Sequence, residues 1–294
     1  MAGEIVCVGE VLWDSLPDGL FLGGAVFNAA CHLRALGEPA VFASRVGDDE
    51  LGREVLRRME RRGLDPGWVQ VDRDLETGFV AVKLDSPGSP RFEILEPSAW
   101  DAIEPDGALI EIARTASALV HGSLALRNGV SRETLRLLFE TGVPRVFDVN
   151  LRPPFVNPAV VEECLRGASI VKLNEEEWEA VRDWLKISGG DQAAAGDLAA
   201  RFGIETICVT RGARGAALWT RGIWAEDPGF RVDVVDTVGA GDAFLAALIA
   251  GFRMDRTPAR ILEEACLLGA FVATRPGATP AIDRTEIEKI RSTR

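Results

Sequence analysis

The most informative stretch of the chain reads Asp236-Thr237-Val238-Gly239-Ala240-Gly241-Asp242 and runs directly into an apolar segment at residues 243–248. The small residues at 239–241 let the backbone approach a ligand closely and turn its N–H groups toward it. A helix that begins near Gly241 adds about half a positive charge at its N-terminus. Together these features predict an anion hole that suits a phosphate group.

Asp242 stands in the first turn of the expected helix, beside this anion hole. The helix dipole should lower the pKa of the carboxyl group, so we expect it to be ionised. An ionised carboxylate can take the proton of a substrate hydroxyl while the hole stabilises charge on a transferring phosphoryl group. A bare G-x-G-D would be explained equally well by a glycine-rich turn with an ordinary acidic helix start.

Outside this stretch, apolar runs rich in Val and Ile alternate with segments of helical periodicity. The expected strands are residues 5–8, 41–46, 118–120, 145–149, 170–173 and 206–210. The clearest expected helices are residues 27–36, 49–62, 131–141, 158–166 and 175–185. This alternation predicts a parallel sheet that is covered by helices on both faces.

One region between residues 67 and 95 breaks the rhythm. Residues 77–84 and 91–95 are two extended runs joined by a Pro- and Gly-containing connection, which is typical of a hairpin. Residues 67–71 are expected to add another strand. We therefore predict a single domain over residues 1–294 with a small inserted antiparallel sheet that acts as a lid. A surface hairpin without a function is the alternative.

The composition excludes several classes of protein. The chain has 294 residues and a net charge of -12, and this acidic field disfavours nucleic acid and anionic membrane as partners. Two histidines leave little room for a zinc site or a Ser-His-Asp triad. Five scattered cysteines without a C-x-x-C pair are expected to be buried free thiols. With no visible signal peptide, these features predict a cytoplasmic protein.

The string at residues 236–248 closely resembles the C-terminal signature of the PfkB, or ribokinase-like, carbohydrate kinases. A second match combines the pair Gly23-Gly24 and Asn28 with a G-x-D-x-x-G turn at residues 47–52. Upstream, Asp14 follows what looks like the first strand of the family. The resemblance runs from about residue 4 to residue 283. It implies a ribokinase-like three-layer α/β/α sandwich with a mostly parallel central sheet, a small β lid and the activity of an ATP-dependent sugar kinase.

The resemblance also implies roles for individual residues. It makes Asp242 the catalytic base, gives the anion hole to Gly239, Ala240 and Gly241, and makes Arg152 a clamp on the phosphoryl group because guanidinium is planar and multidentate. The residues that it assigns to the sugar are Asp14, Gly23, Gly24, Asn28, Ser123 and Asp242. Taken alone, Asn28 would be explained as a helix N-cap, and Asp14 as a solvated loop carboxylate.

The residues that the resemblance assigns to ATP are Asn174, Thr210, Gly212, Gly215, Gly241 and Gly277. Glu177 is expected to hold Mg²⁺ through water, since this ion prefers oxygen ligands and keeps several waters. Asp236 is expected to take part in a monovalent cation site for K⁺, although Ala281 replaces the Ser ligand of some relatives. A helix N-cap followed by acidic first-turn residues explains Asn174 and Glu177 without any ligand.

The choice of sugar depends on two further stretches. Gly122-Ser123-Leu124 and Asp148-Val149-Asn150-Leu151-Arg152 are similar to bacterial fructokinases, which makes fructose the first choice. Kinases of 2-keto-3-deoxygluconate, ribose or a nucleoside remain alternatives, as does a sugar-sensing protein without catalysis. A dehydrogenase would need G-x-G-x-x-G after the first strand, and the chain has none there. By resemblance, we expect a homodimer that forms through the lid.

Overall fold

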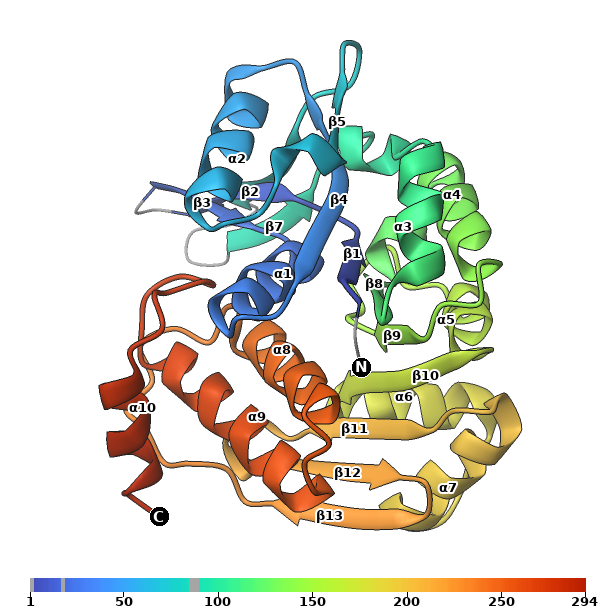
Figure 1. Ribbon diagram of the computed structural model, residues 1–294, viewed down its shortest axis with the longest axis vertical. Helices are drawn as coiled ribbons and strands as arrows, with labels where there is room; N and C mark the ends of the chain where they lie inside the picture. Colours follow the sequence, from blue (N-terminus) through green and yellow to red (C-terminus); the bar gives the residue numbers. More distant parts are fainter. Residues whose placement is uncertain (1–2, 17–18, 85–89) are drawn as a thin grey trace.

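The computed structural model describes residues 3–16, 19–84 and 90–294 (Figure 1). A nine-stranded sheet crosses the described part of the chain in the order β13-β12-β11-β10-β9-β8-β1-β4-β5. Its strands are β1 (Ile5–Val8), β4 (Ala40–Gly47), β5 (Val69–Asp72), β8 (Ala118–Gly122), β9 (Arg145–Asp148), β10 (Ala168–Asn174), β11 (Thr206–Thr210), β12 (Ala216–Thr220) and β13 (Ile223–Asp227). The strands from β11 to β5 pair in parallel, whereas β12 and β13 extend the sheet antiparallel. The prediction of a mostly parallel sheet is confirmed.

Helices cover both faces of this sheet, because each strand buries alternate side chains in opposite directions. In β1, Ile5 and Cys7 belong to one hydrophobic cluster, and Val6 and Val8 belong to the other. The first cluster packs against α1 (Ala25–Ala35), α2 (Glu50–Arg61), α8 (Ala240–Arg253), α9 (Pro258–Ala273) and α10 (Arg284–Arg291). The second packs against α3 (Gly107–Thr115), α4 (Gly129–Phe139), α5 (Pro158–Leu165), α6 (Glu175–Leu185) and α7 (Asp191–Phe202). The three-layer α/β/α sandwich is therefore confirmed.

A separate four-stranded sheet has the order β3-β2-β6-β7. Its strands are β2 (Leu12–Leu16), β3 (Gly19–Gly23), β6 (Gly78–Leu84) and β7 (Pro90–Ile94). Strands β6 and β7 form the expected hairpin, from the pair Val80–Ile94 to the pair Leu84–Pro90. Residues 85–89 of its connection lie outside the described residues. The other half of this small sheet comes from β2 and β3, where no strand was expected. Because β2 pairs with β6 in parallel, the sheet is mixed, and the expectation of an antiparallel sheet is wrong.

The expectation that residues 67–71 join the small sheet is wrong. Strand β5 instead pairs in parallel with the second half of β4, from the pair Ser44–Val69 to the pair Gly47–Asp72. In the strand order β4 lies between β1 and β5, so β1 occupies only one of the two edges of β4. Strand β5 pairs along the other edge of β4. An ion pair of 2.7 Å between Arg45 Nε on β4 and Asp72 Oδ2 on β5 links the two strands.

The polar residues of interest follow the carboxyl ends of the parallel strands. Glu10 comes after β1, Ser123 after β8, and Asp148, Asn174 and Thr210 end β9, β10 and β11. In open α/β sheets, this edge is where ligands bind. The five cysteines are free and buried. In the described ranges, no helix combines the length and the apolar character needed to cross a bilayer.

Candidate active site

The anion hole forms where the chain enters α8. Gly239 precedes the helix with a φ of 78°, and a Cβ at this position would lie 2.3 Å from the carbonyl oxygen of Ala278. Only glycine satisfies both constraints. The N–H of Ala240 already donates to Thr237 O at 3.3 Å, and the N–H of Asp242 donates to Gly239 O at 3.1 Å. Within the described part of the chain, the N–H groups of Gly239 and Gly241 have no acceptor, so they are the two that can receive an anion.

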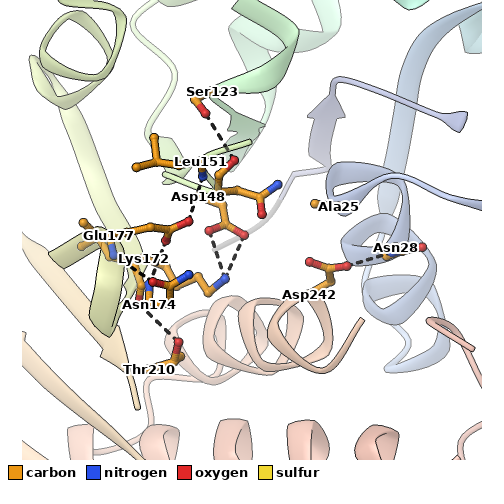
Figure 2. A network of polar contacts seen from close by, with 12 residues as sticks. Ala25, Asn28, Ser123, Asp148, Leu151, Lys172, Asn174, Glu177, Thr210 and Asp242 are labelled. Carbon is orange, nitrogen blue, oxygen red and sulfur yellow. Dashed lines mark hydrogen bonds and ion pairs between the residues drawn. The ribbon is translucent and has the colours of Figure 1, made fainter. Parts of the chain in front are cut away.

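The carboxylate of Asp242 is held by the neighbouring helix α1. The amide Nδ2 of Asn28 donates a hydrogen bond of 2.8 Å to Asp242 Oδ2 (Figure 2). The N-cap of α1 is Gly24, so Asn28 lies within the helix and its interpretation as an N-cap is wrong. The structure therefore brings together two residues that are far apart in the sequence and that the sequence analysis assigned to the sugar.

The expected pKa of Asp242 is wrong in direction. Burial raises its pKa to about 7, although the charges of Lys172 and Arg152 and the Asn28 hydrogen bond oppose the rise. The negative charge of Asp148 raises the pKa of Asp242 further. Loss of water around the carboxyl group thus outweighs the helix dipole. A carboxyl group that titrates near neutral pH is well matched to general-base catalysis.

A second wall of the site comes from the small sheet. Asp14 lies on β2, and a Cβ built on Gly23 of the paired strand β3 would lie 2.6 Å from Asp14 Oδ2. Gly24 has a φ of 115°, and a Cβ there would lie 2.4 Å from the carbonyl oxygen of Glu10. Both glycines therefore allow the backbone to pass close to neighbouring groups. Burial raises the pKa of Asp14 to about 6, against the lowering influence of Arg152.

Glu10 is a residue of this wall that the sequence analysis missed. Its Oε1 accepts a hydrogen bond of 3.0 Å from the N–H of Ala25 and so caps α1, whose N-cap glycine has no side chain. The carboxyl group is almost fully buried, and burial raises its pKa. An acidic residue two positions after a buried strand is the signal of this role in the sequence.

Arg152 faces these acidic groups from the loop that follows β9. Its Nη1 donates to Leu151 O at 3.0 Å, and its charge lowers the pKa values of Glu10, Asp14 and Asp242. The guanidinium group itself is exposed. Ser123 joins the same loop through a hydrogen bond of 3.4 Å from its Oγ to Asn150 O. The expected sugar residues and the expected phosphoryl clamp therefore converge on one site.

Lys172 is the second residue that the sequence analysis missed. Its Nζ lies 3.0 Å from both Asp148 oxygens, and both side chains are buried (Figure 2). Burial favours the neutral amine, but the carboxylates of Asp148, Asp242 and Glu177 outweigh burial and raise the pKa of Lys172. A lysine within an otherwise apolar strand was the available signal, because buried lysine is rare unless it is paired.

Asn174 and Glu177 form a capping box at the start of α6. Asn174 Oδ1 accepts from the N–H of Glu177 at 2.8 Å, and Glu177 Oε2 accepts from the N–H of Asn174 at 2.8 Å. Glu177 Oε1 also accepts from the N–H of Leu151 at 2.8 Å, which ties α6 to the loop of Arg152. The interpretation of these residues as a helix cap is therefore confirmed.

These contacts decide how a metal ion would fit. Both oxygens of the buried Glu177 carboxylate already accept a backbone N–H, and burial raises its pKa. Across the described residues, no three acidic, His or Cys side chains are grouped to hold a metal ion directly. Each carboxylate oxygen retains a second lone pair. The residues therefore fit a hydrated Mg²⁺, held through water, better than a metal that is stripped of its waters.

The residues assigned to ATP lie along the adjacent strand ends. Asn174 is the register partner of Thr210, whose Oγ1 donates to Leu173 O at 3.4 Å. Beyond β11, Gly212 and Gly215 form a tight turn with φ values of 56° and 78°. A Cβ on Gly215 would overlap the carbonyl oxygen of Asp227. This backbone makes the turn compact at the edge of the site.

Asp236 joins the two loops that flank the anion hole. Its Oδ1 accepts from the N–H of Val238 at 3.0 Å, and its Oδ2 accepts from the N–H of Gly277 at 3.1 Å. Ala278, which follows Gly277, is the residue whose backbone lies closest to a Cβ built on Gly239. His32 of α1 supports this loop from below through a 2.9 Å contact between Nε2 and Ala278 O. Asp236 therefore has a structural role besides the cation site expected of it.

Comparisons with known proteins bear on the family and the fold of this chain. A model of the pfkB family carbohydrate kinases matches residues 19–285. A fructokinase of Klebsiella pneumoniae is 33% identical, with 96% of this chain and 97% of the relative covered. A fructokinase of Escherichia coli is 31% identical, with 98% and 99% covered. Among solved structures, the fructokinase of Vibrio cholerae with fructose, ADP and calcium bound is 26% identical, with a TM-score of 0.80 and 98% of each chain covered. The fold also matches a Xylella fastidiosa fructokinase with bound ATP, with a TM-score of 0.83 at 24% identity and 99% and 98% covered.

Proposed function

The chain belongs to the pfkB family of carbohydrate kinases, and from this premise we propose that it transfers the γ-phosphate of ATP to a hydroxyl group of fructose. The carbohydrate kinase activity follows from the family. The choice of fructose is supported by the full-length similarity to fructokinases and by the stretches at residues 122–124 and 148–152. The single observation that carries the chemistry is the Asp242 carboxylate, held by Asn28 beside the free N–H groups of Gly239 and Gly241.

In the proposed mechanism, Asp242 takes the proton from a primary hydroxyl of the sugar as that oxygen attacks the γ-phosphate in line. Asn28 orients the carboxylate, since its amide donates to Oδ2. The N–H groups of Gly239 and Gly241 donate to the phosphoryl oxygens as negative charge develops. Arg152 approaches the same oxygens from the opposite side of the site. Asp14 and the Gly23-Gly24 backbone hold the other hydroxyl groups of the sugar.

The nucleotide is proposed to lie along Asn174, Thr210, Gly212, Gly215 and Gly277. Mg²⁺, held through water beside Glu177, would supply neutralisation of the phosphate charge. Asp236 would contribute to a K⁺ site between the loops that it joins. The small sheet would act as a lid that excludes water and so prevents hydrolysis of ATP. We further propose that the protein is cytoplasmic and forms a homodimer through this sheet.

The test is a panel of acceptors assayed for ADP release with Mg²⁺ and ATP. Fructose should give the highest kcat/KM against ribose, 2-keto-3-deoxygluconate and adenosine, because a site that hydrogen-bonds every hydroxyl rejects analogues that leave a buried group unpaired, often by about 10⁴. The Asp242→Asn variant, purified in the same way, reports any contaminating kinase. A higher kcat/KM for another acceptor would overturn the choice of fructose, and no turnover with any acceptor would contradict the kinase mechanism.

A further inference from the structure

We propose that Lys172 is a positioning residue for phosphoryl transfer, whose buried ammonium fixes Asp148 and keeps the neighbouring Asp242 carboxylate charged and ready to accept a proton. This inference rests on the proposed function and deepens it, because it concerns the same base. Lys172 is not among the residues that the sequence analysis assigned to catalysis, to the sugar or to ATP, and its role is visible only once the strands are folded next to α8.

The geometry places the ammonium between the Asp148 carboxylate and the first turn of α8. Lys172 on β10 is the register partner of Asp148 on β9, and Nζ lies 3.0 Å from both Asp148 oxygens. The side chain of Lys172 is only 8% exposed and that of Asp148 only 4%. On the other side, a Cβ built on Gly241 would lie 3.3 Å from Nζ. The ammonium therefore reaches the first turn of α8, the same turn that carries Asp242 (Figure 2).

This arrangement is poorly explained by stability alone. Burying an ion pair costs desolvation energy that its attraction often fails to recover, so an apolar pair would fold as well. An ammonium beside a helix N-terminus also faces the positive end of the helix dipole. The ammonium instead balances the negative charges of Asp148, Asp242 and Glu177, all of which raise the pKa of Lys172 electrostatically. The buried ammonium of Lys172 therefore serves the reaction rather than the stability of the fold.

The charged groups that face Asp242 act on it in opposite directions. Lys172 and Arg152 favour the ionised carboxylate, and Asn28 of α1 does so by donating a hydrogen bond. Asp148 is the negative charge that disfavours it. Removing Lys172 and removing Asp148 must therefore shift the titration of Asp242 in opposite senses. A residue that only supports the fold would lower activity without such a pattern.

The experiment is the pH profile of kcat/KM for the sugar, whose acid limb reports the base in the free enzyme. Lys172→Met should move this limb to higher pH by about one unit, the lower end of the effect of a nearby opposite charge. Asp148→Asn should move it to lower pH. Lys172→Arg keeps the charge, so its limb should stay near that of the wild type. The matched control is Lys289→Met, an exposed lysine on α10 that should change nothing.

Stability is controlled by a double variant. Lys172→Met alone leaves the Asp148 carboxylate buried without its partner, which is strongly destabilising. The variant Lys172→Met/Asp148→Asn removes both charges, so it should fold and its acid limb should lie between those of the two single variants. If folded variants lose activity while every acid limb stays at the wild-type pH, or if both single variants shift it in the same direction, Lys172 has only a structural role. Full activity of Asp242→Asn would instead overturn the proposed base, whatever Lys172 does.

Discussion

At the scale of the residue, the pKa of Asp242 depends on neighbouring side chains that are distant in the sequence. Asp242 was assigned as the base from its own motif, but its pKa depends on burial and on Lys172, Asn28 and Asp148, which come from three other elements. The sequence therefore indicated which residue to propose as the base and gave the wrong direction for the shift of its pKa. Lys172 itself was missed because a single lysine in an apolar strand does not show which carboxylate it meets.

The raised pKa of Asp242 has a consequence for stability. Its pKa is about 7 in the folded protein and 3.8 for an ordinary aspartate. Between these two values the folded state holds a proton that the unfolded state releases, so the free energy of unfolding falls as pH rises through this window and stays low above it. Asp242→Asn removes this penalty and can still accept the hydrogen bond from Asn28.

We therefore expect Asp242→Asn to have a higher Tm than the wild type at pH 8, and a smaller difference at pH 5. Each pKa unit corresponds to about 1.4 kcal/mol, so several degrees are expected at pH 8. Thermal denaturation at the two pH values measures this. An equal change in Tm at both would mean that the carboxyl group keeps its ordinary pKa in the folded protein.

Asp14 gives a test of the sugar side of the site. Asp14→Ala should raise KM for the sugar by about 10- to 100-fold, since charge-assisted hydrogen bonds contribute about 1.5–3 kcal/mol each. KM for ATP should move little. Steady-state kinetics with each substrate varied in turn checks this, with Asp183→Ala, an exposed aspartate on α6, as the control. An increase in KM for ATP alone would show that the two ends of the site are assigned the wrong way round.

At the scale of the element, the strands and helices of the sandwich were predictable because doubly covered strands are continuously apolar and their helices are amphipathic. Sheet membership was not. Strand β5 was assigned to the lid because it precedes β6 in the sequence, whereas the free edge of β4 decides where it pairs. Strands β2 and β3 were missed because residues 12–23 were read as substrate loops. Both errors concern pairing partners, which local sequence does not encode.

The start of α8 separates a fold requirement from a reaction requirement. Gly239→Ala should reduce both stability and activity, because a Cβ would strain a φ of 78° and meet the backbone of Ala278. Gly241→Ala should fold nearly normally, because its Cβ meets only the Lys172 ammonium, at 3.3 Å. It should lose turnover, because the Cβ crowds the N–H group that is proposed to donate to the phosphoryl oxygens. Tm and kcat together distinguish the two. The control is Gly129→Ala, where a Cβ meets nothing within 4 Å. Equal behaviour of the two α8 variants would contradict this placement of the anion hole.

At the scale of the whole molecule, the small sheet carries both a wall of the proposed sugar site and the proposed dimer contact. Strand β3 lies at its edge and exposes Leu20, 45% accessible, beside the strand that bears Asp14. A second copy that covers this edge would remove both its apolar surface and its unpaired backbone groups. The state of assembly should therefore influence the sugar site more than the nucleotide site.

We expect the wild type to sediment as a dimer and Leu20→Glu to sediment as a monomer with a raised KM for the sugar. The control is Ile223→Glu. It changes an equally apolar, 55% exposed side chain on β13, which is an edge strand of the main sheet and not of the small sheet. Analytical ultracentrifugation measures the mass of each. A monomeric wild type, or dissociation caused only by the Ile223 variant, would contradict a dimer through the lid.

The central claim is that Asp242 is the base of an ATP-dependent sugar kinase, and the most direct test is the kcat of Asp242→Asn with fructose, Mg²⁺ and ATP. The variant keeps the shape of the side chain and removes its capacity to take a proton. The account predicts a fall in kcat of about 10²- to 10⁴-fold, with the affinity for the sugar changed far less. A variant that folds and turns over at close to the wild-type rate would contradict it.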